Sequence, residues 1–135
     1  MLADSSARNL LKAVHVFQID GNLGATAGIA ECLLQSHVAL HFLPALPSSW
    51  KDGSVRGLRA RGAREVGMTW KDGKLAEALV RPQFSGPVEV VGELLRVTCG
   101  GLAVPVTPTD VGFAFAAEGG RSYTLTPLAV ARGEQ

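Results

Sequence analysis

The pattern of hydrophobic and polar residues changes between Pro44 and Pro47. Before this point, residues 20–37 carry apolar side chains at the i, i+3 and i+4 spacing of a helix, with Asp20 or Asn22 placed to cap it. After it, short apolar stretches are separated by turn residues, which is typical of strands. The pattern predicts a helical segment over residues 1–47 and a β domain over residues 48–135.

The helical segment is expected to hold one or two helices. A short helix or turn is predicted over residues 4–14, and the clearer helix over residues 20–37. After its capping position the second helix carries a single charged residue, Glu31, and it begins with several small residues. Helices with so little polar surface are normally surrounded by other elements. We therefore expect this helix to need packing partners.

The β domain is marked by the tetrad Trp-Lys-Asp-Gly, which occurs at residues 50–53 and again at residues 70–73. Asp-Gly favours a tight turn, because glycine accepts a positive φ angle. The second copy lies between two alternating stretches and predicts a hairpin. Strands are expected at residues 58–61, 66–70, 75–80, 88–91, 94–98, 102–106, 111–116 and 121–125. This spacing predicts a mainly β fold, an antiparallel β-sandwich or two-sheet layer preceded by the helices.

The charge balance adds nothing about the fold, but it argues against nucleic acid and anionic membranes as partners. The chain has 135 residues, 13 basic against 12 acidic, and a formal net charge of +1. Nothing in this balance favours nucleic acid or an anionic membrane. The arginines at positions 56, 59, 61 and 64 are expected to form a solvated strand face. No apolar stretch approaches the roughly 20 residues that span a bilayer, and no secretory signal is visible, which leaves the compartment open.

The candidate metal ligands and reactive groups are few. Cys32 and Cys99 stand far apart in different contexts and are expected to be buried thiols. His37 and His41 have the i, i+4 spacing of a metal pair, but the segment between them is expected to be extended and offers no acidic or cysteine ligand. His15 is interpreted as a partly buried histidine, with general base or sugar contact as the alternative. We expect no metal and no cofactor.

Two further patterns have a structural and a functional interpretation. Trp50 and Trp70 could stack on a sugar ring, but tryptophans next to strand turns more often anchor the core. The glycine-rich residues 21–28 open a helix, as phosphate loops do, yet lack the Gly-Lys-Ser/Thr ending. Both patterns are therefore expected to serve packing.

Asp20 is the most informative acidic residue. It follows an apolar run and stands at a helix N-terminus, where the helix dipole favours a carboxylate, so the simple interpretation is an N-cap. Inverting glycosidases use two carboxyl groups about 6.5–9.5 Å apart. Glu31 would lie about 16 Å further along a continuous helix, which is too far for this pairing. Residue type therefore leaves both the cap and the catalytic interpretation open.

A family resemblance favours the catalytic interpretation. The chain closely resembles the C-terminal end of glycoside hydrolase family 95, the inverting α-L-fucosidases. The resemblance rests on Asn9-Leu10, Phe17-Gln18-Ile19-Asp20-Gly21-Asn22 and its continuation to His37, Leu43-Pro44-Ala45-Leu46-Pro47, and residues 50–62 from Trp50-Lys51-Asp52-Gly53 onward. In that family a catalytic (α/α)6 barrel is followed by a C-terminal β domain. The resemblance implies that residues 24–37 form a late barrel helix and that the β domain begins near Trp50.

The resemblance also implies a role for Asp20. The family uses a glutamate as general acid and an asparagine, polarised by an aspartate, to activate the attacking water. The aspartate lies in the Phe-Gln-Ile-Asp-Gly-Asn motif, so the role carries over to Asp20, with a fucosylated glycan as substrate. A carboxylate that accepts a hydrogen bond from an amide makes the amide oxygen a better acceptor for the water proton. The family's sugar-contacting histidine corresponds to Val14, and no role transfers to His15.

Length limits what these residues can do by themselves. The twelve helices of such a barrel need roughly 180 residues, more than the whole chain. We therefore expect a C-terminal fragment of an α-L-fucosidase-like enzyme that is inactive alone and whose acid and asparagine come from elsewhere. The alternative is a non-catalytic β module that binds a glycan or a protein partner. In either case the helix is expected to self-associate or to associate with the missing barrel portion; relatives in the family are often secreted or periplasmic.

Overall fold

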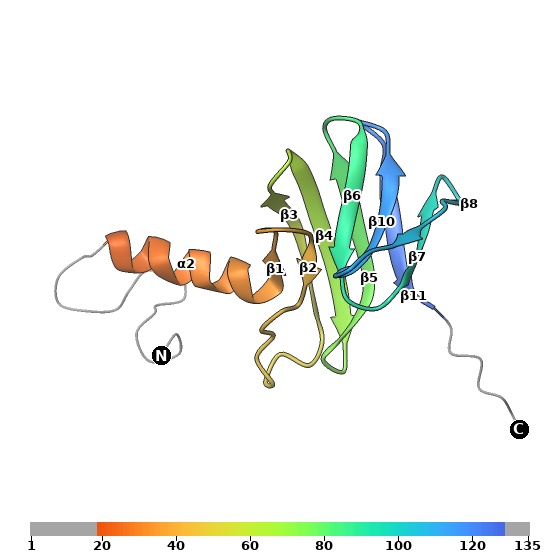
Figure 1. The fold of residues 1–135 in the computed structure, drawn as a ribbon. Coiled ribbons are helices and arrows are strands. Elements are labelled where there is room, and N and C mark those ends of the chain that lie inside the picture. Colours follow the sequence, from red (N-terminus) through yellow and green to blue (C-terminus); the bar gives the residue numbers. More distant parts are fainter. Residues whose placement is uncertain (1–18, 129–135) are drawn as a thin grey trace, which may run out of the picture.

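The computed structural model describes residues 19–128 (Figure 1). This part of the chain contains one helix, α2 (Ile19–Leu33), followed by strands. The strands are β1 (Leu34–Gln35), β2 (His41–Phe42), β3 (Gly53–Ala60), β4 (Arg64–Lys71), β5 (Lys74–Pro82), β6 (Gly86–Val91), β7 (Leu95–Cys99), β8 (Leu102–Ala103), β9 (Thr107–Pro108), β10 (Gly112–Ala117) and β11 (Tyr123–Pro127). The helix predicted over residues 4–14 lies outside the described residues.

The strands form two main antiparallel sheets. One sheet has six strands in the order β3-β4-β5-β11-β7-β8, and the other has three in the order β6-β10-β9. The chain leaves the larger sheet after β5, returns for β7 and β8, and returns again for β11. The prediction of a mainly β, antiparallel fold preceded by a helix is confirmed.

The inner faces of the two sheets share one hydrophobic core. Along β4, Val66 and Met68 are buried and alternate with more exposed positions, as a half-buried strand requires. Phe113 and Phe115 of β10 alternate in the same way, and both belong to the same buried cluster as the β4 residues. The two layers therefore pack as a sandwich.

The two Trp-Lys-Asp-Gly tetrads lie against each other. In the second copy Asp72 and Gly73 have φ angles of 53° and 75°, the two positive angles of a type I′ turn between β4 and β5. Three hydrogen bonds join the copies: from Trp70 Nε1 to the Trp50 carbonyl oxygen (2.9 Å), from the Asp72 amide to Asp52 Oδ1 (2.9 Å), and from the Gly73 amide to the Lys51 carbonyl oxygen (2.8 Å). The repeat is thus a contact between two turns.

Helix α2 ends at Leu33, earlier than the predicted end at His37. The residues that follow form β1, which pairs with β2, and the Leu43 amide donates to the Leu33 carbonyl oxygen at 2.8 Å. Leu33 and Leu34 are buried in the shared core. Burial of this corner of the chain competes with further helical turns, and it ends the helix.

The rest of α2 points away from the sheets. Figure 1 shows the helix meeting the sheets only through its C-terminal end. Thr26, Ala27 and Gly28 are exposed. The predicted boundary between residues 47 and 48 stays a prediction.

One predicted strand is shorter than expected. The stretch 102–106 is regular only over β8, and a second short strand, β9, follows at Thr107–Pro108. Pro105 and Pro108 lack the amide hydrogen that a strand ladder uses, and β8 and β9 are accordingly edge strands, β8 of the six-stranded sheet and β9 of the three-stranded sheet.

Candidate functional site

Asp20 lies in the first turn of α2. The surroundings of its side chain lie outside what the structure describes, so its role as cap or catalytic residue stays a prediction. Glu31 belongs to the same uninterrupted helix, and eleven residues at 1.5 Å each separate the two by about 16 Å. The two carboxyl groups therefore do not form the pair of an inverting glycosidase within this chain.

The histidines do not converge. His37 follows the helix and its Nε2 lies 3.4 Å from Glu31 Oε2, with both side chains more than half exposed. His41 lies in β2, so the i, i+4 spacing does not place it on a helix with His37. Over residues 19–128 no three histidine, cysteine or acidic groups come together as a metal site would require. His15 lies outside the described residues.

The tryptophans serve packing, whereas the packing role expected of the glycine-rich segment stays a prediction. Trp70 is 7% exposed and belongs to the core, and Trp50 is half-buried against it, so Trp70 is not available to stack on a sugar. Residues 21–28 lie inside α2 and not in a loop before it, which removes the geometry of a phosphate-binding turn.

The arginines form the expected solvated face with one exception. Arg56, Arg59 and Arg61 are exposed, and Arg59 Nη2 lies 3.3 Å from Glu65 Oε2 on the neighbouring strand. Arg64 is half-buried and donates from Nη2 to the Pro87 carbonyl oxygen at 3.0 Å. Desolvation by this burial lowers the pKa of Arg64 below its usual value. Arg64 therefore links the two sheets.

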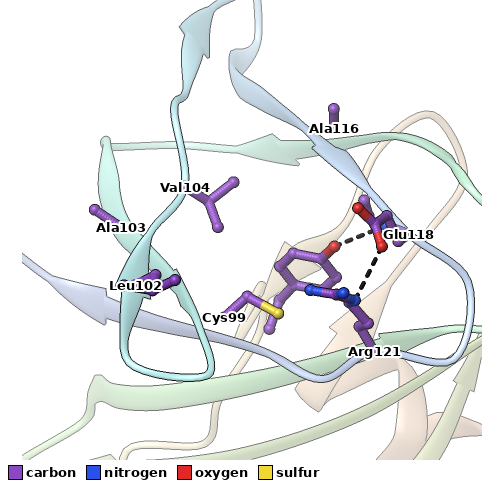
Figure 2. A pocket seen from close by; sticks show the side chains of 9 residues that line it. Cys99, Leu102, Ala103, Val104, Ala116, Glu118 and Arg121 are labelled. Atoms are coloured by element: carbon purple, nitrogen blue, oxygen red, sulfur yellow. Dashed lines mark hydrogen bonds and ion pairs between the residues drawn. The ribbon is translucent and has the colours of Figure 1, made fainter.

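A hollow of about 280 Å³ lies between β7–β8 and the β10–β11 corner (Figure 2). It is lined by Cys99, Leu102, Ala103, Val104, Ala116, Ala117, Glu118, Arg121 and Tyr123. We name this hollow the β7–β11 pocket. It combines charged, aromatic, thiol and apolar groups, so among the described residues it is a candidate binding site.

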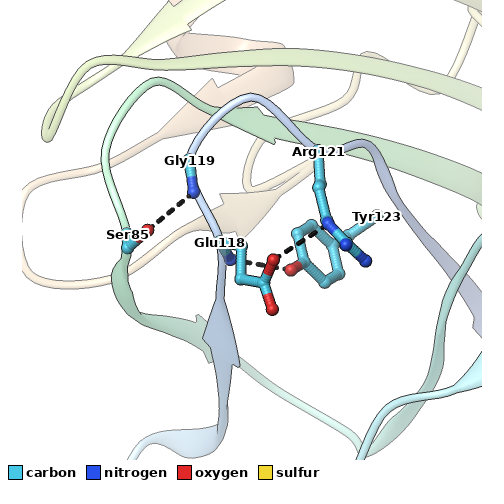
Figure 3. Close-up of polar contacts among 5 residues, drawn as sticks. All are labelled: Ser85, Glu118, Gly119, Arg121 and Tyr123. Carbon is cyan, nitrogen blue, oxygen red and sulfur yellow. Dashed lines mark hydrogen bonds and ion pairs between the residues drawn. The ribbon is translucent and has the colours of Figure 1, made fainter.

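The polar side of the pocket is built on the turn between β10 and β11 (Figure 3). Tyr123 is 3% exposed, and its hydroxyl oxygen accepts a hydrogen bond from the Glu118 amide at 2.7 Å. Arg121 Nε lies 2.9 Å from Glu118 Oε2. The Gly119 amide donates to Ser85 Oγ at 2.9 Å and ties the turn to the β5–β6 loop. Glu118 and Arg121 therefore lie on a turn that hydrogen bonds to Tyr123 and Ser85 hold in place.

Cys99 completes this polar side. Its side-chain hydrogen bond to Arg121, followed by the negative charge of Glu118, raises the pKa of Arg121. Cys99 and Cys32 are both free, and both are half-buried. They are free thiols as expected, but they are only partly buried: Cys32 lies in the last turn of α2, and Cys99 is the last residue of β7 and packs against the edge of the core.

The sequence pattern does not predict the pocket. The strands expected at residues 111–116 and 121–125 leave Glu118, Gly119 and Gly120 as a connection, and Cys99 is expected as a buried thiol, so no pattern places these residues together. The available signal was local: an acidic and a basic residue three positions apart across Gly-Gly, which suits an ion pair over a tight turn. Contact with Cys99 has no local signal, because it depends on the pairing of β7 with β11.

The comparison with protein families agrees with this fold. A sequence model described as "Glycoside hydrolase family 95, C-terminal domain" matches residues 35–125, from β1 into β11. The chain belongs to glycoside hydrolase family 95. The resemblance drawn from the motif around Asp20 is thereby confirmed at the level of the family.

Curated relatives of this family 95 chain are α-fucosidases. Alpha-L-fucosidase 2 of Arabidopsis thaliana is 48% identical over 71 residues, 51% of this chain and 8% of that protein. Probable alpha-fucosidase A of Aspergillus oryzae is 31% identical over 86 residues, 56% of this chain and 12% of that protein. The corresponding protein of Aspergillus niger is 28% identical over 102 residues. The matches cover about a tenth of the length of these relatives.

Within residues 19–128, no helix has the length and apolar character that crossing a bilayer requires.

Proposed function

We propose that this chain provides the C-terminal β domain of an α-fucosidase-like glycoside hydrolase that cleaves fucosylated glycans with inversion. The observation that carries the proposal is the family match, which begins at residue 35 and ends at residue 125 and so covers nearly the whole sandwich. The names of the relatives supply the substrate class. Helix α2 precedes the matched segment and is assigned to the catalytic barrel.

Asp20 is the residue through which the chain would enter catalysis. An aspartate at a helix N-terminus stays ionised readily, because the helix dipole and free amides favour the charge. Its carboxylate would accept a hydrogen bond from an asparagine amide and increase the basicity of the amide oxygen toward a water molecule. The asparagine and the general acid are supplied by barrel elements other than α2. The chain by itself is then inactive.

A chimera tests this proposal. The corresponding C-terminal segment of the Arabidopsis relative is replaced by this chain, and hydrolysis of an aryl α-L-fucoside is measured for the chimera and for the isolated chain. We expect turnover from the chimera and none from the isolated chain. The anomeric configuration of the first sugar released, followed by NMR, is expected to be inverted.

Two variants of the chimera locate the contribution of Asp20. Asp20→Asn is expected to lower kcat by about 10²–10⁴-fold, the range of a lost general-base contribution. Glu31→Gln changes an exposed carboxyl group on the same helix and is expected to leave kcat unchanged. Turnover from the isolated chain, or a folded but inactive chimera, would contradict the proposed role.

A further inference from the structure

The β7–β11 pocket has two chemically different ends. Figure 2 shows Leu102, Ala103 and Val104 on one side, and Glu118 and Arg121 on the other. Leu102 is 75% exposed and stands at this apolar end. A ligand that fits the whole hollow therefore carries an apolar group at one end and several hydrogen-bonding groups at the other.

The charged end has hydrogen-bonding capacity left for a ligand. The ion pair joins Arg121 Nε to Glu118 Oε2, so Glu118 Oε1 is not used in it. A guanidinium carries five N–H donors, and the contact with Glu118 uses the one on Nε. An acceptor and donors side by side on a fixed turn suit a pair of neighbouring hydroxyl groups, each of which donates one hydrogen bond and accepts another.

Tyr123 adds a buried donor. Its hydroxyl oxygen accepts a hydrogen bond from the Glu118 amide. This hydrogen bond leaves the phenolic O–H available as a donor. The Tyr123 side chain lines the pocket, and its ring lies beside Glu118 and Arg121 (Figure 3). The arrangement suits a neutral polyhydroxylated ring better than an anion, because a carboxylate stands beside the guanidinium.

We propose that the β7–β11 pocket binds the terminal 6-deoxyhexose of a glycan, L-fucose. The ring hydroxyls face Glu118 and Arg121, and the methyl group at carbon 6 packs against Leu102 and Val104. The choice of fucose among deoxyhexoses rests on the proposed function, whereas the two-ended chemistry of the pocket does not. Such a site would hold a fucosylated glycan on the β domain.

Cys99 provides a direct test with the full 135-residue chain. Its thiolate displaces iodide from iodoacetamide and forms a carbon–sulfur bond, and mass spectrometry measures the rate at Cys99 and at Cys32 separately. L-fucose at ten times its dissociation constant, which NMR titration determines, is expected to slow alkylation of Cys99 roughly tenfold. Cys32 lies in α2 and is the internal reference, with no expected change.

L-galactose is the matched control ligand, because it differs from L-fucose by one hydroxyl group at carbon 6. It is expected to protect Cys99 clearly less, since that hydroxyl would lose its water at the apolar end. Saturation-transfer NMR is expected to give the strongest signal at the methyl protons of L-fucose. Equal protection by both sugars would overturn the assignment of the apolar end.

Two variants change exposed residues of the pocket and leave the buried core unchanged. Arg121→Gln removes the charge at an exposed position, and Ala116→Leu adds bulk at another exposed position that lines the pocket. Each is expected to abolish the difference in Cys99 alkylation between samples with and without L-fucose. If L-fucose does not slow the alkylation of Cys99 in the unmodified chain, this proposal is overturned, even if the chimera hydrolyses fucosides. If L-fucose slows this alkylation, the proposal is supported, even if the chimera is inactive.

Discussion

At the scale of single residues, Trp50 and Trp70 occupy the same place in a repeated tetrad but contribute different atoms. Trp70 donates its indole N–H, whereas Trp50 accepts through its backbone carbonyl oxygen. Trp70 is also nearly buried, and Trp50 is half-buried. The side chain of Trp70 is therefore the one on which the contact between the tetrads depends.

Trp70→Phe is expected to destabilise the fold by about 1–3 kcal/mol, because the Trp50 carbonyl oxygen loses its donor in a partly buried place. Trp50→Phe keeps that carbonyl and is expected to cost clearly less. Urea denaturation followed by far-UV circular dichroism measures both. Equal losses for the two variants would contradict the hydrogen bond as the cause.

Gly112 shows how closely two backbones approach in the smaller sheet. A Cβ atom added there would overlap the Val90 carbonyl oxygen and lie 2.8 Å from the Gly92 nitrogen. These are backbone atoms of paired strands, which cannot move without breaking the pairing of β6 with β10. The position therefore requires glycine for space.

Gly112→Ala is expected to lower the thermal midpoint strongly, with a loss of about 1–3 kcal/mol or more from overpacking. Gly28→Ala is the matched control, because nothing lies within 4 Å of a Cβ added at that helical position. It is expected to be neutral or to stabilise α2 by up to about 1 kcal/mol. Differential scanning calorimetry compares the two. An unchanged midpoint for Gly112→Ala would show that the strands can separate.

At the scale of elements, the segment between α2 and β3 ties the helix to the sandwich. Leu40 is fully buried, its amide donates to the Glu89 carbonyl oxygen at 2.9 Å, and its own carbonyl accepts from the Val91 amide at 2.8 Å. These bonds add a short parallel bridge beside β6. Leu40 therefore anchors the segment that connects α2 to β3 against the sandwich.

Leu40→Ala is expected to destabilise the fold by about 2–5 kcal/mol through the cavity it leaves. Val38→Ala, two residues away and at an 83% exposed position, is expected to change stability by less than about 0.5 kcal/mol. Urea denaturation measures both variants, and hydrogen exchange reports whether the α2 amides lose protection with Leu40→Ala. A small change in the free energy of unfolding for Leu40→Ala would mean that burial of Leu40 does not anchor the segment between α2 and β3.

At the scale of the whole molecule, the two sheets bury their apolar faces against each other, but α2 meets this core only at its C-terminal end. Its residues Thr26, Ala27 and Gly28 are exposed, and Figure 1 shows the helix directed away from the sheets. A helix with few charges gains free energy by covering its apolar surface. We therefore expect α2 to associate with a second copy of the chain when no barrel portion is present.

Sedimentation velocity over a wide range of concentrations tests this expectation. The chain is expected to associate as concentration rises, and Ala27→Lys is expected to shift it toward monomer by placing a charge on the exposed helix. Thr69→Lys places the same charge on the exposed face of β4 and serves as control. A monomer at all concentrations would count against an uncovered helix.

The predictability of this chain differs between local and long-range features. The hairpin around residues 70–73 follows from alternation and an Asp-Gly turn, both of which act within a few residues. The end of α2 at Leu33 was missed, because it depends on burial against residues far along the chain. The same holds for the contact of Arg121 with Cys99, which depends on β7 and β11 being neighbours.

The amino-acid sequence by itself determined the succession of a helix and short strands, the turns between them, and the family, because these depend on local pattern and on a short motif around Asp20. The tertiary structure alone decided that the two Trp-Lys-Asp-Gly copies meet, that α2 contacts the sheets through its C-terminal end, and that a two-ended pocket forms beside Cys99. The physical reason is that sheet order brings distant strands together. Alternation within a strand assigns a face to each residue, but it does not choose the neighbour across the sheet.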